Sequence, residues 1–173
     1  MQSLLPGLVL LMAALTAPPL VFAQISDEAL GEQVAESVLT YAKFSIFDDI
    51  TVAVDNRVVT LLGRVTTPQK KDEIEKRVAR LDGIRELRNE IGVLPLSPAD
   101  ARLRTRVATA IYNHPAFWRY AQLSNPPIHI IIEHQHITLT GEVSSQVDSM
   151  LAYSLAQVTG ALSITNKLRI ASR

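Results

Sequence analysis

The sequence predicts an α+β fold of two tandem modules. Each module has the element order helix, strand, strand, helix, strand, so that a small three-stranded mixed sheet packs on two helices. Three observations predict this. The chain repeats itself internally, apolar residues recur at helical spacing at the start of each copy, and β-rich segments follow in pairs. With 173 residues, 47% of them apolar, the chain is long enough for two small cores.

The internal repeat is defined by three offsets in residue number. An offset of 73 aligns Asp27, Leu30, Val34 and Val38 with Asp100, Leu103, Val107 and Ile111. An offset of 78 aligns Ile50, Leu61, Gly63 and Val65 with Ile128, Leu139, Gly141 and Val143. An offset of 77 aligns Gly83, Asn89 and Ile91 with Gly160, Asn166 and Leu168. Both copies therefore keep one order of apolar and glycine positions, and one fold is predicted for both.

Local patterns identify the elements of each copy. Leu30, Val34 and Val38 recur every four residues, which is the spacing of a buried helical stripe. Segments 50–54 and 59–65, and their equivalents 128–132 and 137–143, are rich in β-branched residues around a short polar turn and predict hairpins. Thr67 before Pro68 marks the start of the next helix, and Ser144 or Ser145 does so in the second copy. A last strand follows Gly83 and Gly160.

The first 23 residues form an apolar run that ends in Val21-Phe-Ala23, which predicts a signal peptide cleaved before Gln24. One feature is atypical of a signal peptide, because no Lys or Arg precedes the apolar core. The alternative is an uncleaved membrane anchor, which Pro6, Pro18 and Pro19 disfavour as a continuous helix. The predicted boundaries are 1–23 for the signal peptide, 24–94 for the first module and 95–173 for the second. The chain has no cysteine, which excludes disulfides, thiolate metal sites, cysteine nucleophiles and a lipidated cysteine.

The repeated motifs resemble the BON domain family. Leu61-Leu-Gly63-Arg-Val65 with Arg88-Asn89-Glu-Ile91 carries the likeness in the first copy, and Leu139-Thr-Gly141-Glu-Val143 with Thr165-Asn166-Lys-Leu168 carries it in the second. The resemblance implies a periplasmic or outer-membrane-associated module that binds phospholipid or envelope proteins, in some members under osmotic stress. Gly63 and Gly141 are predicted to be structural, because a strand glycine permits close backbone approach or a bulge. Asn89 and Asn166 are predicted to satisfy backbone groups.

Catalytic and metal-binding interpretations find little support in the sequence. There is no nucleophile elbow, phosphate-binding glycine loop or dinucleotide fingerprint, so neither an enzyme nor a cofactor is expected. Asp48 and Asp49 are interpreted as a solvated turn rather than an acid/base pair. His134 and His136 flank Gln135 in the second hairpin, where a polar turn is favoured over a metal site.

The two copies differ in charge. Residues 24–95 hold 10 basic and 13 acidic residues, net −3, and residues 96–173 hold 7 and 4, net +3. The glutamates of the first helix are replaced in the second copy by Ala101, Thr105 and Thr109. The second copy adds Arg102, Arg104 and Arg106, and Trp118, Arg119 and Tyr120 follow. Arginines beside interfacial aromatic rings favour contact with anionic phospholipid or with an outer-membrane surface. These six residues are the predicted lipid-binding site.

Three alternatives to a lipid-binding site remain open. The basic helix could dock on the acidic helix of the first copy, or Trp118 could cover the interface between the copies. Exposed strand edges or apolar seams could instead bind envelope proteins, as a chaperone or adaptor does. Nucleic acid is not expected as a partner, because the chain has no net charge and its basic cluster is small.

Overall fold

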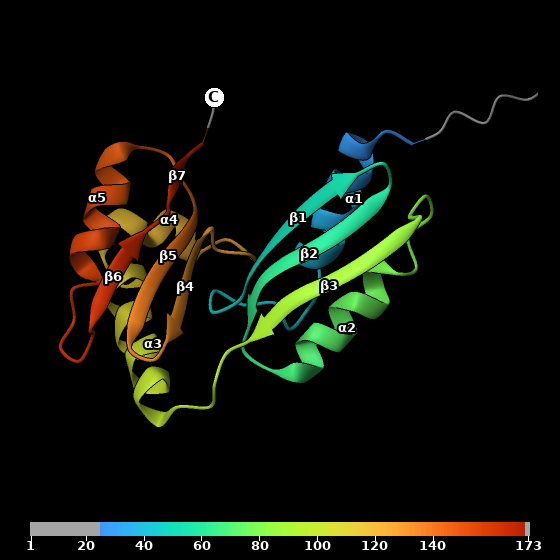
Figure 1. Cartoon of the computed structure of the whole chain (residues 1–173). Helices are drawn as coiled ribbons and strands as arrows, with labels where there is room; N and C mark the ends of the chain where they lie inside the picture. The colour runs from blue at the N-terminus through green and yellow to red at the C-terminus, as the bar shows by residue number, and fades with distance from the viewer. Residues whose placement is uncertain (1–24, 172–173) are drawn as a thin grey trace, which may run out of the picture.

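The computed structural model describes residues 25–171, so the predicted signal peptide lies outside the described part. Module 1 comprises α1 (Asp27–Leu39), β1 (Asp49–Asp55), β2 (Val58–Val65), α2 (Pro68–Val78) and β3 (Glu86–Val93). Module 2 comprises α3 (Pro98–Tyr112), the 3-10 turn η1 (Pro115–Phe117), α4 (Trp118–Ala121), β4 (Ile128–Glu133), β5 (His136–Val143), α5 (Gln146–Leu155), β6 (Ser163–Asn166) and β7 (Arg169–Ile170). The two modules stand side by side, each with its helices on one face of its sheet (Figure 1). The predicted fold class is confirmed.

Both sheets are mixed. In module 1 the strand order is β1-β2-β3, with β1 antiparallel and β3 parallel to β2. In module 2 the order is β4-β5-β6, and β7 continues along β5 beyond β6. The last strand predicted for module 2 is therefore broken between Asn166 and Arg169. Because β1 and β4 each pair with one strand only, both are edge strands.

Serine or threonine hydroxyl groups cap the N-termini of α1, α2, α3 and α5. Thr67 Oγ1 accepts from Lys70 N at the start of α2, as the sequence predicts. In module 2 Ser145, rather than Ser144, caps α5 by accepting from Asp148 N. Ser26 and Ser97 cap α1 and α3 in the same way. The capping residues of α2 and α5 are therefore equivalent in the repeat, whereas Ser97 lies two residues before the position equivalent to Ser26.

A helix-borne carboxylate holds each hairpin turn. Asn56 and Arg57 have positive φ, as do His134 and Gln135 at the equivalent turn. Asp100 Oδ2 and Oδ1 accept from the N–H groups of His134 and Gln135 at 3.0 and 2.8 Å. Asp27 does the same for the turn of module 1. These bonds offset the cost of the left-handed backbone and tie the first helix of each module to its hairpin.

Gly63 and Gly141 occupy equivalent, sterically closed positions. Their φ angles are 121° and 102°, a region that favours glycine. A Cβ atom at Gly63 would lie 2.1 Å from the carbonyl oxygen of Asp49, and one at Gly141 would lie 1.8 Å from that of Pro127. Any side chain at either position would force the hairpin strands apart where the first strand begins.

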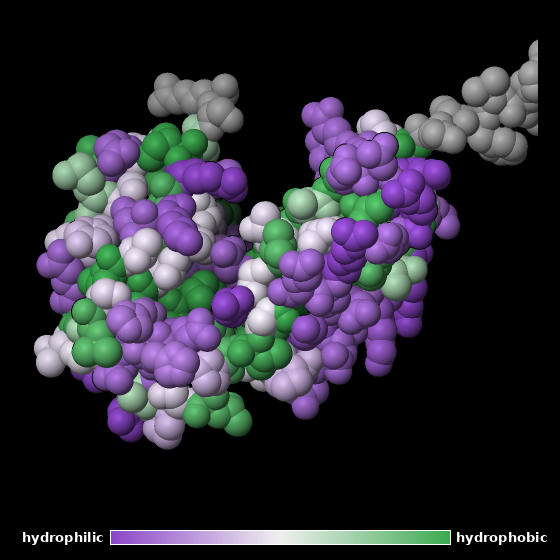
Figure 2. All heavy atoms as spheres, viewed as in Figure 1, coloured by the Kyte–Doolittle hydropathy of each residue, from purple (hydrophilic) through white to green (hydrophobic). Residues whose placement is uncertain are grey.

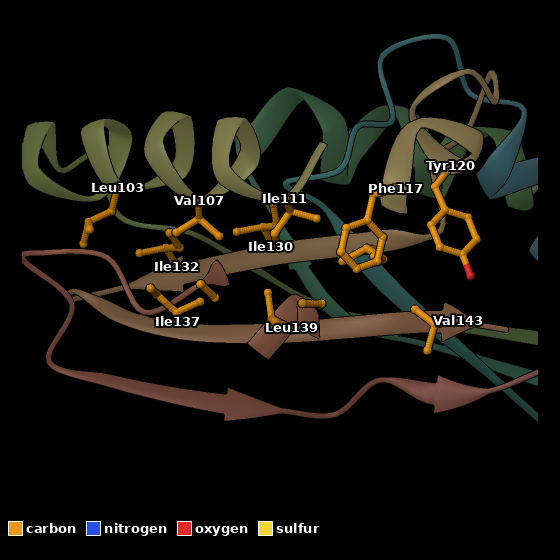
Figure 3. Packing of buried hydrophobic residues seen from close by; sticks show 13 residues of the cluster. Leu103, Val107, Ile111, Phe117, Tyr120, Ile130, Ile132, Ile137, Leu139 and Val143 are labelled. Atoms are coloured by element: carbon orange, nitrogen blue, oxygen red, sulfur yellow. The ribbon is translucent and has the colours of Figure 1, made fainter. Parts of the chain in front are cut away.

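Each module has its own core. In module 2, Leu103, Val107 and Ile111 of α3 point toward strand residues that include Ile130 and Leu139 (Figure 3). The core of module 1 is a separate cluster around Leu30, Val34, Leu61, Ile74 and Ile91. The two cores follow the apolar positions that define the repeat.

The loop between α1 and β1 joins the modules. Ile46 and Phe47 from this loop pack on the core of module 2. The carbonyl oxygen of Ile46 accepts from Ile130 N of β4 at 2.6 Å, and the Phe44 ring lies 5.5 Å from the His129 ring. Arg64 reaches Glu133 across the junction at 3.5 Å. Both faces of β4 are consequently buried, whereas a hairpin strand with one face to solvent would alternate.

Candidate functional site

The three α3 arginines do not form one patch. Residues two apart on a helix point in different directions. Arg106 Nη1 donates to the carbonyl oxygen of Thr159, after α5, at 2.6 Å, whereas Arg104 Nη2 donates to that of Ile132, on β4, at 2.8 Å. Arg106 and Arg104 therefore lie on opposite flanks of α3. Arg102 is exposed and has no hydrogen bond or salt bridge to any described residue.

Arg104 is half-buried between α3 and β4 rather than fully exposed. Burial lowers the pKa of its guanidinium, while the nearby carboxylates of Asp100 and Asp48 act in the opposite direction. Its Nε is buried and has no partner among the described residues. Within residues 25–171 no salt bridge links the α3 arginines to the glutamates of α1, so charge pairing between these two helices does not hold the modules together.

The aromatic residues that follow α3 are divided between surface and interior. Trp118 is 58% exposed, so it does not cover the junction between modules. Tyr120 is buried, and its hydroxyl bonds Ser144 Oγ at 2.9 Å and Asp148 Oδ2 at 3.2 Å. Arg119 stacks on the Tyr120 ring and forms a salt bridge with Asp148 at 2.5 Å. This salt bridge places α4 beside the first turn of α5.

The solvent face of α5 carries apolar residues that the sequence analysis did not single out. Val147 is 72% exposed, Met150 62% and Tyr153 38%, all on one side of the helix. Asp148 is the only charged residue in α5, and Arg119 pairs with it. The repeat could have revealed this stripe, because the offset of 78 that aligns the capping residues Thr67 and Ser145 places Gln69, Asp72 and Glu75 of α2 at the equivalent positions.

The helical layer of module 2 therefore combines apolar and basic groups. Arg102 and Arg106 are the exposed charges of α3, and the bond from Arg106 to Thr159 sets this flank beside the end of α5. In module 1 the same layer exposes Glu28, Glu32 and Glu36 from α1. In Figure 2 hydrophobic residues are more frequent on the surface of module 2, while module 1 shows a mainly hydrophilic surface.

A cleft of about 1200 Å³ lies between the modules, and Figure 2 shows the notch in the surface. One wall is formed by α1 and β1, including Gly31, Ala35 and residues 49–52. The opposite wall is the outer face of the module 2 sheet, including His129, Ile131 and Thr140. His129 Nδ1 and Thr140 Oγ1 are buried and have no partner among the described residues.

Asn89 and Asn166 make contacts within their own modules. Asn89 Nδ2 donates to Glu75 Oε2 of α2 at 2.7 Å, and its Oδ1 accepts from Ile91 N at 3.2 Å. Asn166 donates to Ser149 Oγ of α5 at 3.0 Å and accepts from Leu168 N at 3.1 Å. Each asparagine thus links the second helix of its module to the last strand.

The interpretation of Asp48 as part of a solvated turn is wrong. Its side chain is fully buried, forms a salt bridge with Lys70 at 2.5 Å and accepts from the backbone N–H groups of Ser45 and Thr66. Hydroxyl donors from Ser45 and Thr66 complete the set. A carboxylate surrounded by donors from its own fold fixes the loop that precedes β1, and it leaves no free oxygen to act as a base.

The described histidines are dispersed. His134 lies in the tight turn held by Asp100, and His136 Nδ1 bonds Ser163 Oγ at 2.6 Å. Within residues 25–171, no group of three or more histidine or acidic side chains could hold a metal ion. No helix in this same range is long and apolar enough to cross a membrane.

No curated protein sequence matches the chain significantly. Two solved structures of CdsD, a structural protein of the type III secretion system of Chlamydia trachomatis, are similar at low level. The C-terminal domain is 11% identical, with a TM-score of 0.35 over 86% of this chain and 68% of that one. The second is 13% identical, with a TM-score of 0.28 over 81% and 94%.

The model of the BON domain matches residues 26–95 and 99–172. The two matched segments coincide with the two α+β modules and with the repeated glycine and asparagine motifs. Together they span most of the sequence, so the chain belongs to the BON domain family and carries two tandem copies of the domain.

Proposed function

We propose that this chain is a non-enzymatic periplasmic envelope protein that binds anionic phospholipid through the helical layer of module 2. By doing so it supports envelope integrity or osmotic stress tolerance. The observation that carries the proposal is the exposed, nearly uncharged stripe of α5, formed by Val147, Met150 and Tyr153. Large apolar side chains that gather on a surface mark a site of interaction.

The basic flank of α3 supplies the electrostatic half of the contact. Arg102 and Arg106 can reach phosphate groups while the α5 side chains enter the interfacial region, as in amphipathic surface helices. Trp118 supplies a ring suited to the headgroup level. Of the six residues predicted from sequence, Arg102, Arg106 and Trp118 remain suited to lipid contact, and Arg119 contributes only if it leaves Asp148.

Rough magnitudes describe a reversible association. Burial of a Val or Met side chain is worth about 1.5–3 kcal/mol when complete, and interfacial insertion is partial. Each well-placed arginine adds about 1 kcal/mol at an anionic surface. Several such contributions, reduced by the entropy lost on binding, favour a peripheral protein that high salt releases.

Family membership supports the compartment and the absence of chemistry. BON domain proteins are generally non-catalytic and are known in general for phospholipid binding. The expected signal peptide in residues 1–23 adds the export route. An envelope location would give the helical layer of module 2 access to a membrane surface.

The proposal is tested by co-sedimentation with vesicles of 30% phosphatidylglycerol in phosphatidylcholine. Val147→Glu is expected to reduce the bound fraction at least tenfold, because it places a charge at the most exposed position of the apolar stripe. Gln69→Glu, the equivalent position in module 1, is the matched control and should bind as the wild type does. Replacement of Arg102 by Ala should weaken binding about fivefold, in line with about 1 kcal/mol. Equal sedimentation of Val147→Glu and Gln69→Glu would refute the proposal.

A further inference from the structure

The β4 edge of the module 2 sheet is closed by three hydrogen bonds to other parts of the protein. Ile128, Ile130 and Ile132 of β4 direct backbone groups away from β5. Tyr112 Oη donates to the carbonyl oxygen of Ile128 at 2.5 Å, and Arg104 Nη2 donates to that of Ile132. The carbonyl oxygen of Ile46 accepts from Ile130 N. Unpaired strand edges invite other strands, and these three bonds close this one.

The equivalent edge in module 1 is open. Ile50 pairs with Gly63 as Ile128 pairs with Gly141, so the common register directs the backbone groups of Ile50, Val52 and Val54 outward. Within residues 25–171, no backbone or side-chain hydrogen bond reaches these groups from outside the sheet.

The sequence difference behind the open edge is simple. The offset of 73 places Gly31 where module 2 has Arg104, and Leu39 where it has Tyr112. The geometry agrees, because a Cβ atom at Gly31 would lie 3.6 Å from Val54 Cγ2, beside the residue equivalent to the Arg104 acceptor Ile132. Module 1 therefore lacks both side chains that close the edge in module 2.

This open edge forms part of the cleft between the modules. Ile50 and Val52 line it together with Gly31 and Ala35, small residues that leave room beside the strand. On the opposite wall His129 is only 7% exposed and, like Thr140, holds a buried polar atom without a partner among the described residues. In Figure 1, β1 and β4 are the strands that face each other across the junction.

The charges around the cleft indicate the sign of an occupant. Arg64 pairs with Glu133, and Arg169 pairs with Glu142. Glu28, Glu32 and Asp49 then remain against Lys167. The cleft has a net negative charge, concentrated on the wall that carries the open edge.

We propose that the cleft binds an extended segment of another protein, which carries basic residues and adds to β1 as a fourth strand of the module 1 sheet. Main-chain hydrogen bonds to Ile50, Val52 and Val54 supply affinity, and alternate side chains face α1 and the module 2 wall. Basic side chains of the segment pair with Glu28, Glu32 and Asp49. This proposal is independent of the lipid contact, which uses the helical layer of module 2 and not the cleft.

The binding test uses three fluorescein-labelled ten-residue peptides, titrated with the full chain and followed by fluorescence anisotropy. The peptides alternate lysine with valine, glutamate with valine, and lysine with proline. The Lys–Val peptide is expected to bind saturably. The Glu–Val peptide should bind at least tenfold more weakly because of its charge, and the Lys–Pro peptide likewise because proline removes N–H donors. Binding of none of them, or equal binding of all three, would overturn the proposal.

Two arginine variants separate edge pairing from charge. Gly31→Arg introduces into module 1 the equivalent of Arg104, which closes β4 in module 2. It is expected to weaken Lys–Val binding at least tenfold. Gln33→Arg adds the same charge on an exposed position of α1 outside the cleft and should change binding less than threefold. Wild-type affinity in Gly31→Arg would overturn the proposal. Retained unfolding midpoints would show that both variants fold.

Amide exchange gives a second, direct measurement. Addition of the Lys–Val peptide should slow hydrogen exchange at the amides of Ile50, Val52 and Val54 and leave the outer edge of β3 unchanged. Protection at β3, or no protection at β1 in the presence of saturating peptide, would contradict pairing at this edge.

Discussion

Replacement of Asp48 by Ala removes a buried carboxylate on which one ammonium group and four other donors converge. Lys70 lies 2.5 Å from it and is only 13% exposed. Ser45 N and Thr66 N donate at 2.9 and 2.8 Å, and both residues also donate through their hydroxyl groups. Loss of one partner of a buried ion pair costs about 3–5 kcal/mol. Lys70 can move toward solvent, so we expect about 3 kcal/mol, a large fraction of the stability of a small domain.

The assay is equilibrium unfolding in urea, followed by far-ultraviolet circular dichroism and by the fluorescence of Trp118, the only tryptophan. Trp118 reports on module 2, whereas the dichroism reports on both modules. Asp48→Ala should lower the dichroism midpoint strongly. It should also lower the fluorescence midpoint to a smaller degree, because residues 44–47 pack against module 2. Asp49→Ala is the control, since Asp49 makes no side-chain hydrogen bond or salt bridge within residues 25–171. Equal midpoints for the two variants would refute the reasoning.

Two further predictions concern stability. Gly141→Ala should destabilise the protein by more than about 2 kcal/mol in the same urea assay, because its Cβ atom would lie 1.8 Å from the carbonyl oxygen of Pro127, and a change below 0.5 kcal/mol would contradict the geometry. Burial and the hydrogen bond to Glu73 raise the pKa of Tyr41 to about 12, and burial raises the pKa of Tyr112 above its ordinary value. Since tyrosine in the unfolded chain loses its proton near pH 10, the stability contributed by these neutral side chains is complete below about pH 10 and falls as pH rises toward 12. Phenolate absorbance should show these two tyrosines ionising late, and Tyr112→Phe should remove one late step; ionisation of all four near pH 10 would contradict it.

Much of the fold could be predicted from the sequence because the repeat constrains most of its elements twice. The stripe of Leu30, Val34 and Val38, the hairpin around Gly63 and the capping Thr67 each have an equivalent in module 2. Local physical chemistry determines these features. The break in the last strand of module 2 and the short helices at Pro115 and Trp118 have no counterpart in module 1, so the repeat could not indicate them.

The predicted site was grouped by proximity in the sequence, and the structure separates several of its residues. Arg102 and Arg104 are two positions apart on a helix, and this spacing alone should have separated them. The role of Arg104 depends on β4, which is 28 residues away, and the burial of Asp48 depends on Lys70. Such contacts arise from tertiary packing and are not encoded in local periodicity. The α5 stripe was accessible from sequence, but only by comparison of Val147 with Gln69.

The central functional claim is that the helical layer of module 2 faces a membrane. The chain has no cysteine, so single spin labels can be attached at Met150→Cys on α5 and at Asp72→Cys, its equivalent on α2. Collision rates with a water-soluble nickel complex and with oxygen are then measured with and without vesicles of 30% phosphatidylglycerol in phosphatidylcholine. The account predicts that vesicles shield the label at position 150 from nickel and expose it to oxygen, while the label at position 72 stays aqueous. Unchanged nickel access at position 150 in the vesicle-bound protein would contradict the account.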